Sequence, residues 1–274
     1  MKYFTTEIKT NLENAPEQPV TLSCYIPDNS QEIDIDRLHP AVVILPGGGY
    51  HFTSYRENEA VALKYISEGI CAFVLEYHVA PVRFPVALCE ALLSVLYVRD
   101  HAKEYHIDPD NISVCGFSAG GHLAASTGVF WNNDYILKLL DIEPEKLKPN
   151  KLILSYPVIT SGEYAHRGSF ENLLGDEKEN ERWLEFNSLE KQVTKDTPET
   201  FIWHTYDDTV VPVQNTMLFA SALIEKQIPT ELHIYKSGSH GLSLGNYLVY
   251  GDKKYGESHM SSDWIDKAVR FIYD

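Results

Sequence analysis

One serine in this chain lies where a nucleophile is expected. The run Gly116-Phe117-Ser118-Ala119-Gly120 matches the pattern Gly-x-Ser-x-Gly, with a β-rich run before it and a helix-like run after it. A sharp turn from a strand into a helix presents a serine hydroxyl above a sheet, and glycines on either side leave room for that turn. We therefore predict Ser118 as the nucleophile of a covalent acyl transfer.

A serine hydroxyl is a weak nucleophile, and it needs a base that is itself held by a carboxylate. His240 follows the last β-rich run in a loop of glycine and serine, and Asp207 and Asp208 follow the β-rich run before it. Read back from the following Val-Pro, the pattern Asp-x-x-Val-Pro selects Asp208 as the acid. Asp207 is the alternative if the turn is one residue tighter. His204, at the end of a predicted strand, is a candidate supporting residue.

A glycine-rich loop could stabilise the charge that develops on an attacked carbonyl. Pro46 and three glycines follow a fully apolar run, and backbone N–H groups in such a loop can face a ligand without obstruction by side chains. We predict the N–H groups of Gly48, Gly49 and Ala119 as the oxyanion donors. The alternatives are a plain turn and a phosphate-binding loop, but no Gly-Lys-Ser/Thr follows.

Four residues after the glycine loop are candidates to line the substrate pocket, and their aromatic members could stack on sugar rings: Tyr50, His51, Tyr55 and Arg56.

The elements that must position these residues alternate between strands and helices after residue 40. This alternation predicts a mainly parallel central sheet with helices on both faces, and the first two strands predict an antiparallel start. The predicted strands are 3–10, 19–26, 41–45, 70–76, 112–115, 152–156, 200–204 and 231–235, and the predicted helices are 57–68, 86–105, 120–130, 213–227 and 261–272.

The stretch 158–198 is too long for a bare connection in a compact domain. We interpret it as a small, lid-like helical insertion over the edge of the sheet at which the strands end. The sequence has no internal repeat or linker, so residues 1–274 are expected to form one domain.

Composition restricts the partners of the chain. A formal charge of −16 argues against a nucleic-acid partner. No apolar run approaches the roughly 18 residues of a membrane span. The first residues lack the apolar core of a secretory signal, so a cytoplasmic location is the default expectation. Four scattered cysteines without a CxxC pair predict buried free thiols. Oligomeric state is left open, with a homo-oligomer as one option.

Taken together, these segments resemble the α/β-hydrolase superfamily, and within it the esterases similar to hormone-sensitive lipase and to acetylxylan esterases. One departure is Pro46, because the usual motif has a histidine before its glycines. This departure puts long-chain lipase activity in doubt but leaves the backbone donors in place. The resemblance is carried by Leu45–Tyr50, Tyr77–Pro81, Ile107–Ile112, Gly116–Leu123, His166–Phe170, Asp207–Pro212 and Ser239–Gly241.

The resemblance implies a serine esterase that hydrolyses short acyl esters, with acetyl groups on sugars as the expected substrates and no metal or organic cofactor. Two alternatives stay open at this point. An amidase or formamidase of the same fold would use the same three residues. A hydrolase-fold protein that only binds its ligand would belong to another class, although such proteins usually lose the serine or the histidine.

Overall fold

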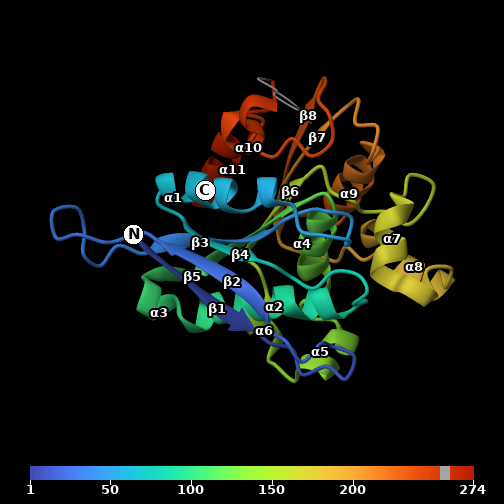
Figure 1. The fold of residues 1–274 in the computed structure, drawn as a ribbon, viewed down its shortest axis with the longest axis horizontal. Coiled ribbons are helices and arrows are strands. Elements are labelled where there is room, and N and C mark those ends of the chain that lie inside the picture. Colours follow the sequence, from blue (N-terminus) through green and yellow to red (C-terminus); the bar gives the residue numbers. More distant parts are fainter. Residues whose placement is uncertain (254–259) are drawn as a thin grey trace.

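Continuous apolar runs form the centre of a single sheet in the computed structural model, which describes residues 1–253 and 260–274 (Figure 1). β3 and β4 are buried at every position, as expected for strands that are covered on both faces. The eight strands are β1 (Lys2–Ile8), β2 (Val20–Ile26), β3 (His39–Leu45), β4 (Cys71–Leu75), β5 (Ile107–Phe117), β6 (Lys151–Ser155), β7 (Glu199–Thr205) and β8 (Thr230–Tyr235).

The sheet has the order β1-β2-β4-β3-β5-β6-β7-β8. β2 pairs antiparallel with both β1 and β4, whereas every pairing from β4 to β8 is parallel. The predicted antiparallel start and parallel remainder are therefore confirmed. Because the parallel strands all end at the same edge, the loops after β3, β5, β7 and β8 can meet there.

Helices cover both faces of the sheet, as predicted. Alternate residues of β3 belong to two separate apolar clusters. Val43 belongs to the cluster that also contains apolar residues of α2, α4 and α9, whereas Val42 and Ile44 belong to the cluster that contains residues of α1 and α11. The two groups of helices lie on opposite faces of the sheet (Figure 1). The helices are α1 (Glu59–Ser67), α2 (Val86–Asp100), α3 (Ala102–Tyr105), α4 (Ala119–Phe130), α5 (Asp134–Leu140), α6 (Pro144–Leu147), α7 (Arg167–Leu174), α8 (Glu181–Phe186), α9 (Gln214–Glu225), α10 (Tyr247–Tyr250) and α11 (Trp264–Tyr273).

Most predicted boundaries differ from the structure by one to three residues, and two differ in a larger way. The helix expected over 86–105 is interrupted at His101, which lies between α2 and α3. β5 begins at Ile107 instead of residue 112, because Ile107 pairs with His39 across an irregular register. Its polar residues 108–111, with a proline among them, have the composition of a turn and hide this extension in the sequence.

The long stretch 158–198 is helical, as expected, and contains α7 and α8, which lie together at one side of the molecule (Figure 1). Short 3₁₀ turns at Gly175–Glu177 and Leu189–Lys191 connect them to the rest of the chain. Among the described residues, no helix has the length and apolarity that crossing a bilayer requires.

Two glycines permit the turn from β5 into α4. A Cβ atom on Gly116 would lie 2.1 Å from the carbonyl oxygen of Gly120, and one on Gly120 would lie 2.1 Å from the carbonyl oxygen of Leu45. Both clashes are with backbone atoms, so side chains at these positions would force β5, α4 and the end of β3 apart.

We predict that Gly116→Ala lowers the free energy of unfolding by about 3 kcal/mol. The added methyl group would overlap backbone atoms, which cannot move aside as a side chain could. This corresponds to a fall of about 6–10 °C in melting temperature. Gly168→Ala is the matched control, since its Cβ would meet only the Cε1 atom of His166 at 3.7 Å. Equal melting temperatures for the two variants would contradict the prediction.

Candidate active site

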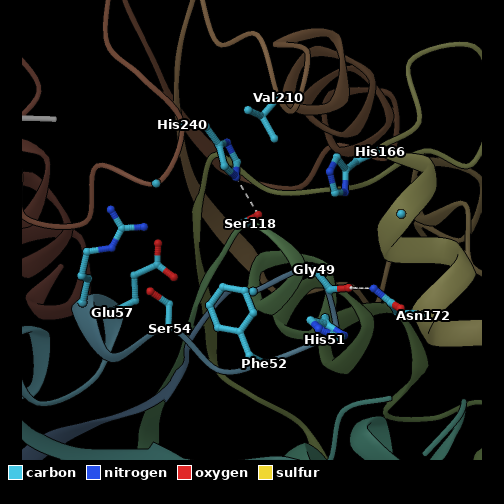
Figure 2. A pocket seen from close by; sticks show the side chains of 14 residues that line it. Gly49, His51, Phe52, Ser54, Glu57, Ser118, His166, Asn172, Val210 and His240 are labelled. Atoms are coloured by element: carbon cyan, nitrogen blue, oxygen red, sulfur yellow. Dashed lines mark hydrogen bonds between the residues drawn. The ribbon is translucent and has the colours of Figure 1, made fainter. Parts of the chain in front are cut away.

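Ser118 occupies the turn between β5 and α4 in a backbone conformation that L-residues rarely adopt, with φ 53° and ψ −117°. Its N–H donates to the carbonyl of Ser155 at 3.0 Å, and its carbonyl accepts from His122 and from Val158, each at 3.0 Å. These three bonds hold the strained residue, and the hydroxyl faces a hollow above the sheet (Figure 2).

The hydroxyl of Ser118 begins a chain of short hydrogen bonds. Its Oγ lies 2.7 Å from Nε2 of His240 (Figure 2), and Nδ1 of His240 lies 2.6 Å from Oδ2 of Asp208. Because a carboxylate can only accept, Nδ1 carries the proton and Nε2 is left to accept from the serine. The structure thus brings together the three residues that the sequence singled out, in the tautomer that a general base requires.

Asp208 is buried among donors. Its Oδ1 accepts from the backbone N–H groups of Val210 and Val211 at 2.8 and 3.0 Å. Burial alone would raise the pKa of this carboxyl group, but hydrogen bonds from His204 and His240 outweigh burial and hold the pKa of Asp208 well below its usual value. The group is therefore a stable carboxylate that stabilises a proton on its neighbour.

Asp207, the alternative acid, lies elsewhere. Its Oδ1 accepts from the N–H of Gly238 at 2.8 Å, in the loop that carries His240. It therefore supports the loop, while Asp208 contacts the imidazole.

His204 supports the acid from the end of β7. The ring is fully buried, with Nδ1 2.8 Å from the hydroxyl of Thr216 and Nε2 2.9 Å from the carbonyl of Val211. Since a carbonyl only accepts, Nε2 carries a proton, and it also lies 3.3 Å from Oδ2 of Asp208. This contact fits the supporting role that its place at a strand end suggested.

The glycine loop lies beside Ser118. Gly48 and Gly49 line the same hollow and have positive φ angles of 135° and 64°. A Cβ on Gly48 would lie 1.9 Å from the carbonyl oxygen of Phe52, so only glycine fits. Among the described residues, no acceptor pairs with the N–H groups of Gly48, Gly49 or Ala119, which leaves all three for a ligand.

The hollow has a volume of about 370 Å³. Of the four predicted pocket residues, His51 and Arg56 line it. It is lined by Gly48, Gly49, His51, Phe52, Ser54, Arg56, Glu57, Ser118, His166, Gly168, Asn172, Val210, His240 and Gly241 (Figure 2).

The other two predicted pocket residues lie outside this hollow. Tyr50 is buried and turns inward, and its hydroxyl is 2.8 Å from Nδ1 of His122. Tyr55 is 73% exposed and lines a separate surface hollow with Leu63 and Leu248. The prediction that Tyr50 and Tyr55 line the substrate pocket was therefore wrong.

Several lining residues were not predicted. His166, Gly168 and Asn172 reach the hollow from the insertion, and the side-chain amide of Asn172 donates to the carbonyl of Gly49 at 2.9 Å. The segment His166–Phe170 is one of those that carry the family resemblance, so the sequence contained a signal that this part of the insertion is functional. Glu57 was taken as the start of a helix, and no local pattern marks its role.

His122 connects the glycine loop, through Tyr50, to the turn between β5 and α4 that carries Ser118, which we call the elbow. It is buried in α4, and its Nε2 lies 2.9 Å from the carbonyl of Asn187, so this nitrogen carries the proton and Nδ1 accepts from Tyr50. Burial lowers the pKa of His122 from 6.5 to about 4.

Among the described residues, no cluster of three or more side chains could hold a metal ion.

Comparisons with known proteins show which family this chain matches. The family model BD-FAE matches residues 22–223. The endo-1,4-β-xylanase B of Butyrivibrio fibrisolvens is 38% identical over 228 residues, which cover 80% of this chain and 35% of that protein. The acetylxylan esterase of Xylanibacter ruminicola is 29% identical over 253 residues, covering 90% of this chain and 49% of its own length. The chain thus spans half or less of these curated relatives.

A solved structure matches over nearly the full length. The acetyl ester-xyloside bifunctional hydrolase of Caldicellulosiruptor lactoaceticus is 34% identical, with a TM-score of 0.82, covering 98% of this chain and 95% of that one. A second solved structure, the α/β hydrolase MGS-M1 from a deep-sea metagenome library, is 34% identical, with a TM-score of 0.75, covering 98% of this chain and 96% of that one. The fold is therefore that of the α/β-hydrolases, as the resemblance implied.

The lowered pKa of His122 predicts a pH dependence of stability. The unfolded chain binds a proton at this residue between pH 6.5 and about 4 while the folded chain does not, so stability falls as pH falls through that window. The side chain of the His122→Gln variant cannot take up this proton. We therefore expect its free energy of unfolding to fall between pH 7 and pH 4.5 by about 2–3 kcal/mol less than that of the unaltered protein. Urea denaturation at both pH values measures this, and equal losses would refute it.

Proposed function

The chain belongs to the BD-FAE family, and we propose that it is a serine carboxylesterase that hydrolyses short acyl esters, with acetyl groups on carbohydrate as its substrates. The observation that carries the proposal is the hydrogen-bonded chain from Ser118 through His240 to Asp208, which opens on a hollow beside the glycine loop. The substrate class is supported by the names of the acetylxylan esterase and the acetyl ester-xyloside hydrolase to which the chain is similar.

In the first step, Ser118 Oγ attacks the ester carbonyl as Nε2 of His240 takes its proton. The imidazolium that forms is stabilised by the carboxylate of Asp208 2.6 Å away, which stays ionised because its pKa is held low. The unpaired N–H groups of Gly48, Gly49 and Ala119 receive the oxyanion. His240 then gives its proton to the leaving alcohol.

In the second step, water replaces the alcohol. His240 takes a proton from the water, whose oxygen attacks the acyl-enzyme carbonyl, and the same backbone donors hold the second oxyanion. Collapse returns the proton to Ser118 Oγ and releases the carboxylic acid.

The size of the hollow supports short acyl groups. About 370 Å³ lies near the lower end of the range for small-molecule pockets, which suits an acetyl group and part of a sugar ring. The insertion 158–198 contributes His166, Gly168 and Asn172 to the wall, and we propose that it acts as the lid that selects the alcohol portion.

Ser118→Ala should abolish hydrolysis of p-nitrophenyl acetate, with a fall in kcat on the order of 10⁵-fold or more. Asp208→Asn should lower kcat by about 10³–10⁴-fold, because the imidazole loses its orientation and tautomer. Asp207→Asn is the matched control and should change kcat less than about tenfold. A larger effect at Asp207 than at Asp208 would reverse the assignment of the acid.

An acyl-chain series tests the substrate class. We expect kcat/KM to be highest for acetyl and propionyl p-nitrophenyl esters and to fall by at least about tenfold at octanoyl, since each added methylene must find room in a small hollow. Acetylated xylo-oligosaccharides should release acetate, and p-nitroacetanilide should be a poor substrate. Rates that rise with chain length, or an amide cleaved faster than its ester, would contradict the proposal.

A further inference from the structure

A buried carboxylate other than Asp208 lines the hollow, and it takes no part in the hydrogen-bonded chain of Ser118, His240 and Asp208. Glu57 is 2% exposed. Its Oε2 accepts from the N–H of Gly47 at 2.8 Å, and its Oε1 accepts from the hydroxyl of Tyr156 at 2.7 Å. Burying a charge is costly unless it is well paired, so a carboxylate in this place needs an explanation.

The first bond of Glu57 fixes the glycine loop. Gly47 immediately precedes the predicted oxyanion donors, and its carbonyl accepts from the N–H of Ser54 at 2.8 Å. With both polar groups of Gly47 bonded, the peptide that carries the N–H of Gly48 has one orientation. A Cβ on Gly47 would lie 3.0 Å from Cβ of Ser118, so this peptide packs directly against the elbow.

The second bond reaches the loop that carries His240. The hydroxyl of Tyr156 accepts from the N–H of Ser243 at 2.8 Å, three residues beyond His240. The ring of Tyr156 also packs edge-on against the imidazole, with the ring centroids 5.1 Å apart. The side chain of Ser243 donates to the carbonyl of Arg56 at 2.6 Å and closes the connection.

Backbone strain marks the same residues. Tyr156 and Ser243 both have positive φ angles, of 37° and 50°, in the left-handed region that costs a non-glycine residue about 1 kcal/mol or more. Such conformations persist where the surroundings hold them, and they cluster at functional sites. The strain places the phenol hydroxyl and the Ser243 N–H where they meet.

The donors around Glu57 are arranged for its ionised form. Ser243 donates to the Tyr156 oxygen, so the phenol hydrogen is left for Glu57, and Gly47 supplies a second donor. Both oxygens of Glu57 therefore face donors. Burial raises the pKa of Glu57 above its usual value, and the bonds from Tyr156 and Gly47, with the charges of His240 and Arg56, offset only part of that rise.

We propose that Glu57 is a positioning residue for ester hydrolysis, whose single carboxylate fixes the oxyanion loop through Gly47 and the His240 loop through Tyr156. This inference rests on the proposed function. Glu57 would thus hold both the oxyanion donors and the base His240 in place relative to Ser118.

Glu57→Gln tests the anchor, because an amide presents one acceptor where two donors converge. We expect kcat for p-nitrophenyl acetate to fall about 10–100-fold, as small displacements of reacting groups do, with KM within about threefold. The titratable and charged groups around Glu57 are Arg56, Tyr77, Cys115, Tyr156 and His240.

Of these groups, histidine is the type that changes charge near neutral pH. Loss of the neighbouring negative charge should therefore shift the acid limb of the kcat/KM profile to lower pH by about half a unit or more.

Glu90→Gln is the matched control. Glu90 is 1% exposed, and its two oxygens accept from Nδ1 and the backbone N–H of His78 at 2.6 and 2.9 Å. It should lose stability as Glu57→Gln does but keep kcat and the pH profile. If Glu57→Gln also keeps both, Glu57 is only structural and the proposal is overturned.

Tyr156→Phe keeps the proposal testable if Glu57→Gln does not fold. It keeps the ring against His240 and removes the connecting hydroxyl, so we expect about a tenfold fall in kcat, and an unchanged kcat would overturn the proposal. Where both variants fold, the double variant should be no slower than Glu57→Gln, because both lose one connection, whereas fully additive effects would overturn it. Failure of Ser118→Ala to abolish hydrolysis would instead overturn the proposed function, so the two failures are distinguishable.

Discussion

The structure depends on how closely β5 and α4 approach at Ser118. The backbone of this residue is strained, and it holds its conformation because glycines remove every side chain that would block the approach. Backbone bonds to Ser155, His122 and Val158 then fix it between the ends of two strands and the first turn of a helix. Strain of this kind persists only where the surrounding structure holds it in place, so the site depends on the sheet and helix that pack around Ser118.

The parallel sheet determines what surrounds the serine. β3, β7 and β8 end at the same edge as β5, and the loops that follow them supply the glycines, Asp208 and His240. Charge is distributed unevenly in this space. Asp208 has several donors, and its pKa is held low, whereas burial raises the pKa of Glu57 in spite of its two donors. The imidazole of His240 is thus linked to two buried carboxylates: it contacts Asp208 directly, and it packs against Tyr156, whose hydroxyl donates to Glu57.

Patterns local in the sequence were sufficient to predict the sheet, the elbow, and the loops with Ser118, Asp208 and His240. Turn chemistry and apolar runs act over a few residues, so they can be recognised without the fold. Glu57 could not be found this way, because its partners lie ten and 99 residues away. Tyr50 was misplaced because its positive φ of 55° accompanies a side chain that packs inward against His122, which residue type alone does not reveal.

In the proposed mechanism, Ser118 forms a covalent intermediate with the help of His240. Treatment of the folded protein with a fluorophosphonate, followed by peptide mass spectrometry, tests it most directly, because such reagents trap activated serines. We expect one adduct, on Ser118, and its loss when His240 is replaced by alanine. An adduct on another residue, or unchanged labelling of Ser118 without His240, would contradict it.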